Sequence, residues 1–166
     1  MRLFLIAACI TLAACASPYQ QQGLGGGFDE TQLDANVWRV SFRGNGYTRG
    51  ERAEDLALLR SADLALMNGF KFFALSDART RTNVSSYTAP LVANTTGSAY
   101  GVGNEVYANS VTRFNGGNTT FISKPTAVNT VTMFKEKPDL NAMIFDAAFI
   151  CQSLGKKYEV VCGVVK

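Results

Sequence analysis

Cysteine is the residue type whose surroundings in this chain define a chemistry most clearly. The chain has four cysteines, and Cys15 ends the stretch Leu12-Ala13-Ala14-Cys15. An aliphatic residue and two small residues before a cysteine form the pattern called a lipobox. A signal peptidase needs small residues before its cleavage site, and the cysteine thiol accepts a diacylglycerol group before cleavage. The pattern therefore predicts lipidation of Cys15 with diacylglycerol and palmitate-type chains.

The residues before Cys15 fit a secretory signal. Arg2 precedes an apolar stretch, Leu3 to Ala14, which is too short for the roughly 20 residues that a membrane-spanning helix needs. A second copy of the pattern ends at Cys9, but cleavage there would leave almost no apolar region. Both cysteines could also be ordinary small residues of the signal core; the charged start and the place of Cys15 at its end argue against this. We therefore predict a signal peptide over residues 1–14.

The residues after Cys15 indicate a tether and a location. The segment 15–30 is rich in Gln and Gly, and such a segment cannot bury enough apolar surface to order itself. We therefore predict a lipidated, flexible tether with a reach of roughly 20 Å. Ala16 and Ser17 follow the cysteine in place of the aspartate that retains such proteins in the inner membrane. This favours lipid anchoring in the cell envelope, at the outer membrane and facing the periplasm.

The other two cysteines, Cys151 and Cys162, are a disulfide candidate. An even pair in an oxidising compartment is typically bridged, although two buried thiols acting as small hydrophobic residues would also fit. A zinc site would need two more nitrogen or sulfur ligands. The chain has no histidine and no Cys-x-x-Cys spacing, so we predict no metal site and no cofactor.

One loop could bind an anion. It joins a predicted strand to the start of a predicted helix, where free amides and the helix dipole favour negative charge. Its candidate ligand-binding residues are Arg43, Asn45, Tyr47 and Arg49. The loop lacks the Lys-Ser/Thr ending of a phosphate-binding loop, and a simple turn before a helix cap is the commoner explanation of its glycines.

Other chemistry is weakly indicated. Without histidine, the commonest general base and the Ser-His-Asp arrangement are both excluded. Glu54, Asp55 and Asp63 could form an acid pair on a helix, but a solvated helix surface is the simpler interpretation. Asp146 interrupts an apolar helical run, and its side chain is a candidate hydrogen-bond acceptor. No run of Lys and Arg suggests nucleic-acid binding, and we predict that the chain is not an enzyme.

The hydrophobic patterns predict an α+β fold. A strand at Val37–Arg43 alternates apolar and polar residues, and a Thr48–Glu51 capping box starts a helix that ends near Met67, before Asn68-Gly69. Further predicted elements are strands at 70–76 and 128–135, a helix from Pro138 to Gly155 and a last strand at 158–165. Residues 79–126 are dense in Thr, Asn, Ser and Gly, which predicts either short antiparallel strands, for instance near 105–114, or a mobile excursion.

Together these elements predict one periplasmic domain, residues 31–166, with 79–126 as a variable insert. Its architecture would be a two-layer sandwich of two main helices on a mixed, mostly antiparallel sheet.

The sequence also resembles a group of small lipoproteins common in alphaproteobacteria. The resemblance covers most of the mature chain outside the insert. It is carried by the lipobox, by Trp38–Asn45 (WRVSFRGN), by Lys137-Pro138 and by Asp146-Ala147-Ala148. It implies an envelope location and brings no catalytic residues with it.

Three functions follow as hypotheses. The first is a membrane-anchored, non-enzymatic lipoprotein with a structural or interaction role, whose partners are the membrane and an envelope protein or the cell wall. The second is a small-ligand binder that uses the Arg43–Arg49 loop for an anionic glycan or phosphate. The third is an uncharacterised periplasmic enzyme.

Overall fold

The structure, a computed structural model, describes residues 15–163. The predicted signal peptide, residues 1–14, and the end of the predicted last strand lie outside this range. The chain forms two compact units. One contains the residues up to Asn83 together with those from Ser123 onward, and the other is Val84–Ile122, inside the predicted insert.

The first unit is built on a five-stranded sheet with the order β1-β2-β6-β3-β7. Its strands are β1 (Gly27–Asp34), β2 (Val37–Arg43), β3 (Phe72–Thr88), β6 (Thr119–Phe134) and β7 (Ile144–Asp146). The β1–β2, β2–β6 and β3–β7 pairs are all antiparallel. Strands β3 and β6 continue into the second unit.

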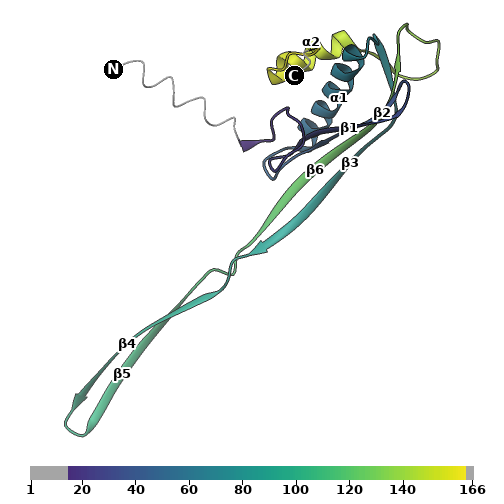
Figure 1. The fold of residues 1–166 in the computed structure, drawn as a ribbon. Helices are drawn as coiled ribbons and strands as arrows, with labels where there is room; N and C mark the ends of the chain where they lie inside the picture. The colour runs from purple at the N-terminus through teal and green to yellow at the C-terminus, as the bar shows by residue number, and fades with distance from the viewer. Residues whose placement is uncertain (1–14, 164–166) are drawn as a thin grey trace, which may run out of the picture. The chain divides into compact units, whose positions relative to one another are not determined.

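Two helices cover one face of this sheet (Figure 1). They are α1 (Gly50–Met67) and α2 (Ala147–Tyr158). Alternate residues of β2 and β6, such as Val40, Phe42 and Val131, are fully buried beneath them. The core forms two clusters, and α1 contributes to both. The predicted α+β two-layer sandwich is therefore confirmed.

The first helix is placed as expected, but it starts differently. Asn68 ends it, and Gly69 follows with a φ of +76°, a backbone conformation that glycine adopts without steric cost. At the other end the capping box is wrong: the N-cap is Arg49, without a side-chain hydrogen bond. The hydroxyl of Thr48 is instead bonded to residues outside the helix, as described below.

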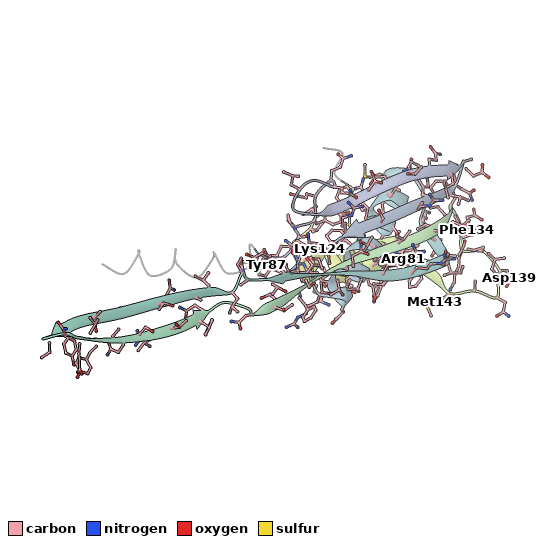
Figure 2. The ribbon with its side chains drawn as sticks, turned by 90° about the horizontal axis from the view of Figure 1, so that it is seen from below. Arg81, Tyr87, Lys124, Phe134, Asp139 and Met143 are labelled. Carbon is pink, nitrogen blue, oxygen red and sulfur yellow. A yellow bond between two sulfur atoms is a disulfide. The ribbon has the colours of Figure 1, made fainter. Side chains whose placement is uncertain are left out.

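The C-terminal elements also differ from the prediction. The segment after β6 is irregular and exposes Met143 (Figure 2). Helix α2 then begins after Asp146, whose carboxylate accepts a hydrogen bond from the Phe149 amide at 3.0 Å. The predicted helix start at Pro138 is therefore nine residues too early, since the first helical residue is Ala147.

The predicted last strand from Tyr158 is wrong within the described residues. Helix α2 continues to Tyr158, and Glu159 ends it in a left-handed conformation with a φ of 57°. The Val160 amide closes this turn by donating to the Gly155 carbonyl at 2.9 Å. Val160 and Cys162, which alternate along the described part of this segment, pack on the core. Period-two patterning alone does not distinguish this role from that of a strand.

The second unit is a β-ribbon. Strands β4 (Val92–Val102) and β5 (Glu105–Asn115) pair along their whole lengths in a two-stranded sheet. The ends of β3 and β6 in this unit are linked through the hydroxyls of Thr88 and Thr119, 2.9 Å apart. The strand expected near 105–114 is confirmed, and the strands are long rather than short.

Candidate functional site

The residues that follow Cys15 are held on the first unit. Ser17 is fully buried, and its amide donates to the Thr48 hydroxyl at 3.0 Å. The Asn45 amide donates to the Ser17 hydroxyl at 2.9 Å, and the Asn45 side chain donates to the Cys15 carbonyl at 2.8 Å. Ser17, Asn45 and Thr48 thus form a connected set of hydrogen bonds, which we call the anchor clasp.

The turn that carries the clasp is itself ordered by Asn45. The Asn45 side-chain oxygen accepts hydrogen bonds from the Tyr47 amide and the Thr48 hydroxyl, both at 3.0 Å. An asparagine that bonds the backbone two residues on stabilises a turn locally. The side chain therefore has two roles: its oxygen shapes the turn, and its nitrogen binds the segment after Cys15.

Glycine is required on the other side of the clasp. The Ser17 hydroxyl donates to the Gly25 carbonyl at 2.5 Å. Gly26 has a φ of +93°, and a side chain there would collide with the carbonyl of Arg43 and lie 2.5 Å from the Ser17 hydroxyl. The Gly-rich composition that predicted a flexible tether thus allows this close approach of backbones.

The predicted tether over residues 15–30 is therefore largely part of the fold. Ser17 is buried, Tyr19 packs against Phe28 with ring centroids 4.9 Å apart, and β1 begins at Gly27. Composition does not reveal this order, because Ser17 and Tyr19 find their hydrogen-bond partners in the loop before α1 and in α1 itself. Cys15 itself is exposed and is not part of a disulfide.

The predicted anion-binding loop is the same loop that carries the clasp. Arg43, Tyr47 and Arg49 are exposed, whereas both polar ends of the Asn45 side chain are engaged by the protein. The four predicted residues thus do not converge on a common ligand. Among residues 15–163 there is also no group of three or more His, Cys, Asp or Glu side chains placed to bind a metal ion.

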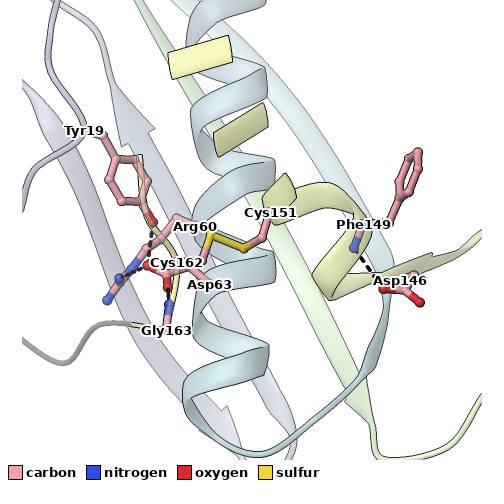
Figure 3. Close-up of a disulfide and its surroundings, with 8 residues drawn as sticks. All are labelled: Tyr19, Arg60, Asp63, Asp146, Phe149, Cys151, Cys162 and Gly163. Carbon is pink, nitrogen blue, oxygen red and sulfur yellow. Dashed lines mark hydrogen bonds and ion pairs between the residues drawn. A yellow bond between two sulfur atoms is a disulfide. The ribbon is translucent and has the colours of Figure 1, made fainter. Parts of the chain in front are cut away.

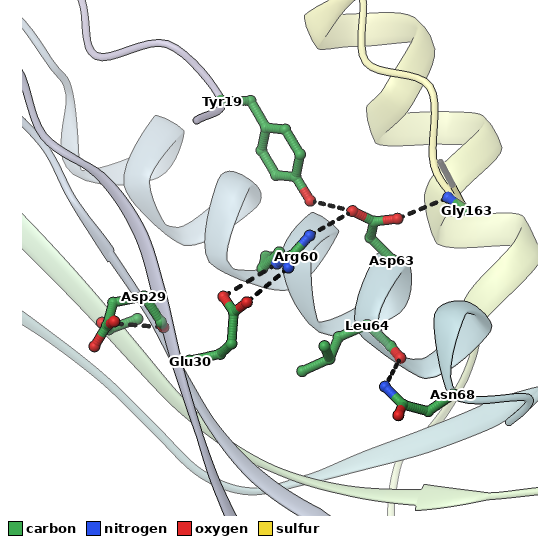
Figure 4. Close-up of polar contacts among 9 residues, drawn as sticks. Tyr19, Asp29, Glu30, Arg60, Asp63, Leu64, Asn68 and Gly163 are labelled. Carbon is green, nitrogen blue, oxygen red and sulfur yellow. Dashed lines mark hydrogen bonds and ion pairs between the residues drawn. The ribbon is translucent and has the colours of Figure 1, made fainter. Parts of the chain in front are cut away.

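A buried polar cluster includes Tyr19, two residues after Ser17 of the anchor clasp (Figure 4). Arg60 of α1 forms ion pairs with Glu30 at 2.7 Å and with Asp63 at 2.9 Å. Asp63 also accepts hydrogen bonds from the Tyr19 hydroxyl at 2.8 Å and from the Gly163 amide at 2.7 Å. The cluster therefore joins the N-terminal segment, β1, α1 and the C-terminal segment.

Burial and charge act together on Tyr19. Desolvation of the phenol, and then the adjacent Asp63 carboxylate, raise the pKa of Tyr19 far above its ordinary value. Tyr19 therefore stays protonated at physiological pH and donates a hydrogen bond to Asp63. Asp63 was expected on a solvated helix surface, but it is only 4% exposed.

A cleft of about 600 Å³ opens beside this cluster. Its lining includes Tyr19, Phe28, Arg60 and Val161. The guanidinium of Arg60 stacks over the Phe28 ring at 4.1 Å, and its ion pairs point to Glu30 and Asp63. The polar groups here bind one another, so the arrangement is suited to fixing four segments of chain rather than to moving a proton.

The disulfide candidate is confirmed. Cys151 and Cys162 are bridged, with α-carbons 6.0 Å apart (Figure 3). The bridge ties α2 to the segment that supplies the Gly163 amide to Asp63. Helix α2 is also joined to α1 through Asp55, whose carboxylate accepts from Lys157 and Tyr158, each at 2.7 Å.

The chain matches no protein-family model, no curated protein and no solved structure. Among residues 15–163, no helix is both long and apolar enough to cross a lipid bilayer.

The clasp should contribute measurably to stability. We expect Ser17→Ala to lower the free energy of unfolding by about 1–3 kcal/mol, because it leaves the Gly25 carbonyl without its buried partner and weakens the bonding of the Asn45 amide. Denaturant unfolding of the two proteins measures the difference. Ser76→Ala is the matched control, since Ser76 is exposed and shares only a 3.3 Å contact with Thr132. Equal stabilities for both variants would contradict the clasp.

The buried cluster should be far more sensitive than a surface ion pair. We expect Asp63→Ala to cost about 3–5 kcal/mol, because it leaves Arg60 with Glu30 as its one carboxylate partner and the Gly163 amide with none. Asp77→Ala removes an Asp–Arg pair of the same 2.9 Å length at the surface and should cost less than about 1 kcal/mol. Thermal and denaturant unfolding compare the two, and a similar cost for both would refute the structural role of the cluster.

Proposed function

We propose that this chain is a lipid-anchored lipoprotein of the bacterial envelope, at the outer membrane facing the periplasm, with a structural or interaction role rather than a catalytic one. The observation that best supports it is the anchor clasp. The lipobox cysteine is followed after one residue by the fully buried Ser17, and the Cys15 carbonyl accepts from Asn45 at 2.8 Å. Acyl chains on Cys15 would therefore be attached to a residue that is itself hydrogen-bonded to the domain.

This arrangement would keep the domain at the membrane surface. Only Ala16 separates Cys15 from Ser17, and consecutive α-carbons are about 3.8 Å apart. The first unit could not stand away from the headgroups by the roughly 20 Å that a free tether of this length allows. The clasp would therefore hold the face of the domain that carries Ser17 and the Asn45–Thr48 turn against the membrane.

The exposed side chains of the clasp loop suit such a position. Arg43 and Arg49 are exposed within a few residues of Asn45, and basic side chains near a membrane surface are attracted to anionic headgroups. The loop would then meet phosphate as part of the membrane rather than as a free ligand.

The anchor is tested by substitution of the two lipobox cysteines. We expect Cys15→Ser to abolish incorporation of an alkyne-tagged palmitate, to leave the precursor unprocessed and to remove the protein from the outer-membrane fraction. Cys9→Ser is the matched control and should be labelled and processed normally, since Cys9 would leave with the signal peptide. Normal labelling of Cys15→Ser, or loss of labelling in Cys9→Ser, would overturn the proposal.

A further inference from the structure

The β4–β5 ribbon has two edges without a partner. In the residues that the structure describes, β4 and β5 form a sheet of their own with no third strand (Figure 1). Every residue of both strands is exposed. A two-stranded hairpin alone is marginally stable in water, and a third or fourth strand is what gives such a sheet independent stability.

The outer edge of β5 lacks the features that usually block pairing. Natural sheet edges are protected by lysine, proline, bulges or short strands. Strand β5 contains neither proline nor lysine, and its only charged residues are Glu105 and Arg113. It pairs with β4 without a register shift from Glu105 to Asn115, so its free edge is long and is not interrupted by a bulge.

The turn determines which backbone groups are free. Gly103 has a φ of +65° and is followed by one further turn residue, Asn104, which is the pattern of a two-residue type II′ hairpin. Such a turn closes on a hydrogen-bonded pair, here Val102 and Glu105. Every second residue from Glu105 then bonds to β4, and the intervening ones direct their amide and carbonyl groups outward. These are Val106, Ala108, Ser110, Thr112 and Phe114.

We propose that this edge binds the same edge of a second copy of the chain, antiparallel and with the two-fold axis at Asn109. In that register Glu105 lies opposite Arg113 of the second copy, and the symmetry creates this opposite-charge pair twice. The outward-facing backbone groups of one copy then meet those of the other, because Ala108 opposes Ser110. Glu105 accepts from the Tyr107 hydroxyl through one carboxylate oxygen, which leaves the other oxygen for arginine.

The charges select this arrangement over its neighbours. A parallel, in-register pairing would set Glu105 beside Glu105 and Arg113 beside Arg113, and like charges directly opposite are destabilising. Moving the two-fold axis to Ser110 would place Arg113 opposite Tyr107 and Glu105 opposite Asn115, so neither charge would have a partner. Only the Asn109-centred register pairs both charges of the strand.

The pairing would also suit the faces of the ribbon. Residues directly opposite in β4 and β5 share a face, and one face carries Phe114, Ala93, Ala108 and Ala99 without any charged side chain. The opposite face carries both charges and the stacked rings of Tyr100 and Tyr107, 5.6 Å apart. An antiparallel second copy continues each face, so the four-stranded sheet would be uncharged on one side and polar on the other.

The inference rests on the proposed function in one respect: it names a second copy of the chain as the partner in the proposed interaction role. It depends on the β5 edge and not on Cys15. Loss of acyl labelling in Cys15→Ser and loss of pairing at β5 are therefore separate outcomes, and one can fail while the other holds.

Cross-linking at the axis tests the pairing in the full-length protein in its native membrane. Opposite residues of a pair that is not hydrogen-bonded have α-carbons about 4.5 Å apart, which a disulfide can span. Asn109→Cys should therefore give a disulfide-linked dimer on non-reducing gels. Thr95→Cys, equally exposed on β4, should not. Cross-linking of Asn109→Cys no stronger than that of Thr95→Cys would overturn the proposal.

Charge reversal tests the register. In the Asn109→Cys background, Glu105→Arg should lower the cross-linked fraction about tenfold, because two opposite-charge pairs become like-charge pairs. Adding Arg113→Glu to the same chain restores both pairs with reversed sign and should recover the dimer. A double variant that cross-links no better than Glu105→Arg alone would exclude this register.

Discussion

A buried charge in the middle of α1 is the constraint on which the first unit depends. Arg60 and Asp63 lie on a helix that is buried along most of its length, and a buried charge is tolerated only when it is paired and hydrogen-bonded. Their partners come from Glu30 in β1, Tyr19 in the N-terminal segment and the Gly163 amide near the other end of the described chain. Both ends of the domain are thus folded against α1 by the requirement to satisfy these groups.

The disulfide and the anchor clasp extend the same organisation outward. The Cys151–Cys162 bridge fixes the segment that delivers the Gly163 amide. The clasp fixes the segment that delivers Tyr19, through Ser17 and the Asn45–Thr48 turn. In the proposed function, this makes the lipid attachment point a rigid part of the domain. The exposed β4–β5 ribbon would then be free to pair while the body of the protein is held at the membrane.

Much of the layer architecture could be predicted from the sequence because short-range residue patterns determine its strands and helix ends. The alternation in Val37–Arg43 and the Asn68-Gly69 helix end both identify the elements that the structure contains. The Cys151–Cys162 bridge was also predicted, but from a strand that does not form: Cys162 reaches Cys151 from the segment after α2. Patterns of period two or of short turns could not reveal that Glu159 ends the helix in a left-handed conformation.

The anchor clasp and the buried cluster could not be predicted because they depend on contacts between distant residues. Ser17 and Thr48 are 31 residues apart, and Gly163 and Asp63 are 100 residues apart. The composition of residues 15–30 predicted a flexible tether, and the position of Asp63 on a helix predicted a solvated side chain. One clue was present: the segment SPYQ offers a hydroxyl and a phenol immediately after the lipobox, where a pure Gly and Gln tether would offer neither.

Residue-resolved amide hydrogen exchange in the protein is the most direct test of the claim that the segment after Cys15 belongs to the fold. We expect the Ser17 amide to be protected from exchange to about the same degree as core amides of α1, because it is buried and donates to Thr48. Exchange at Ser17 as fast as at the exposed Asn104 in the β4–β5 turn would contradict the claim and restore a free tether.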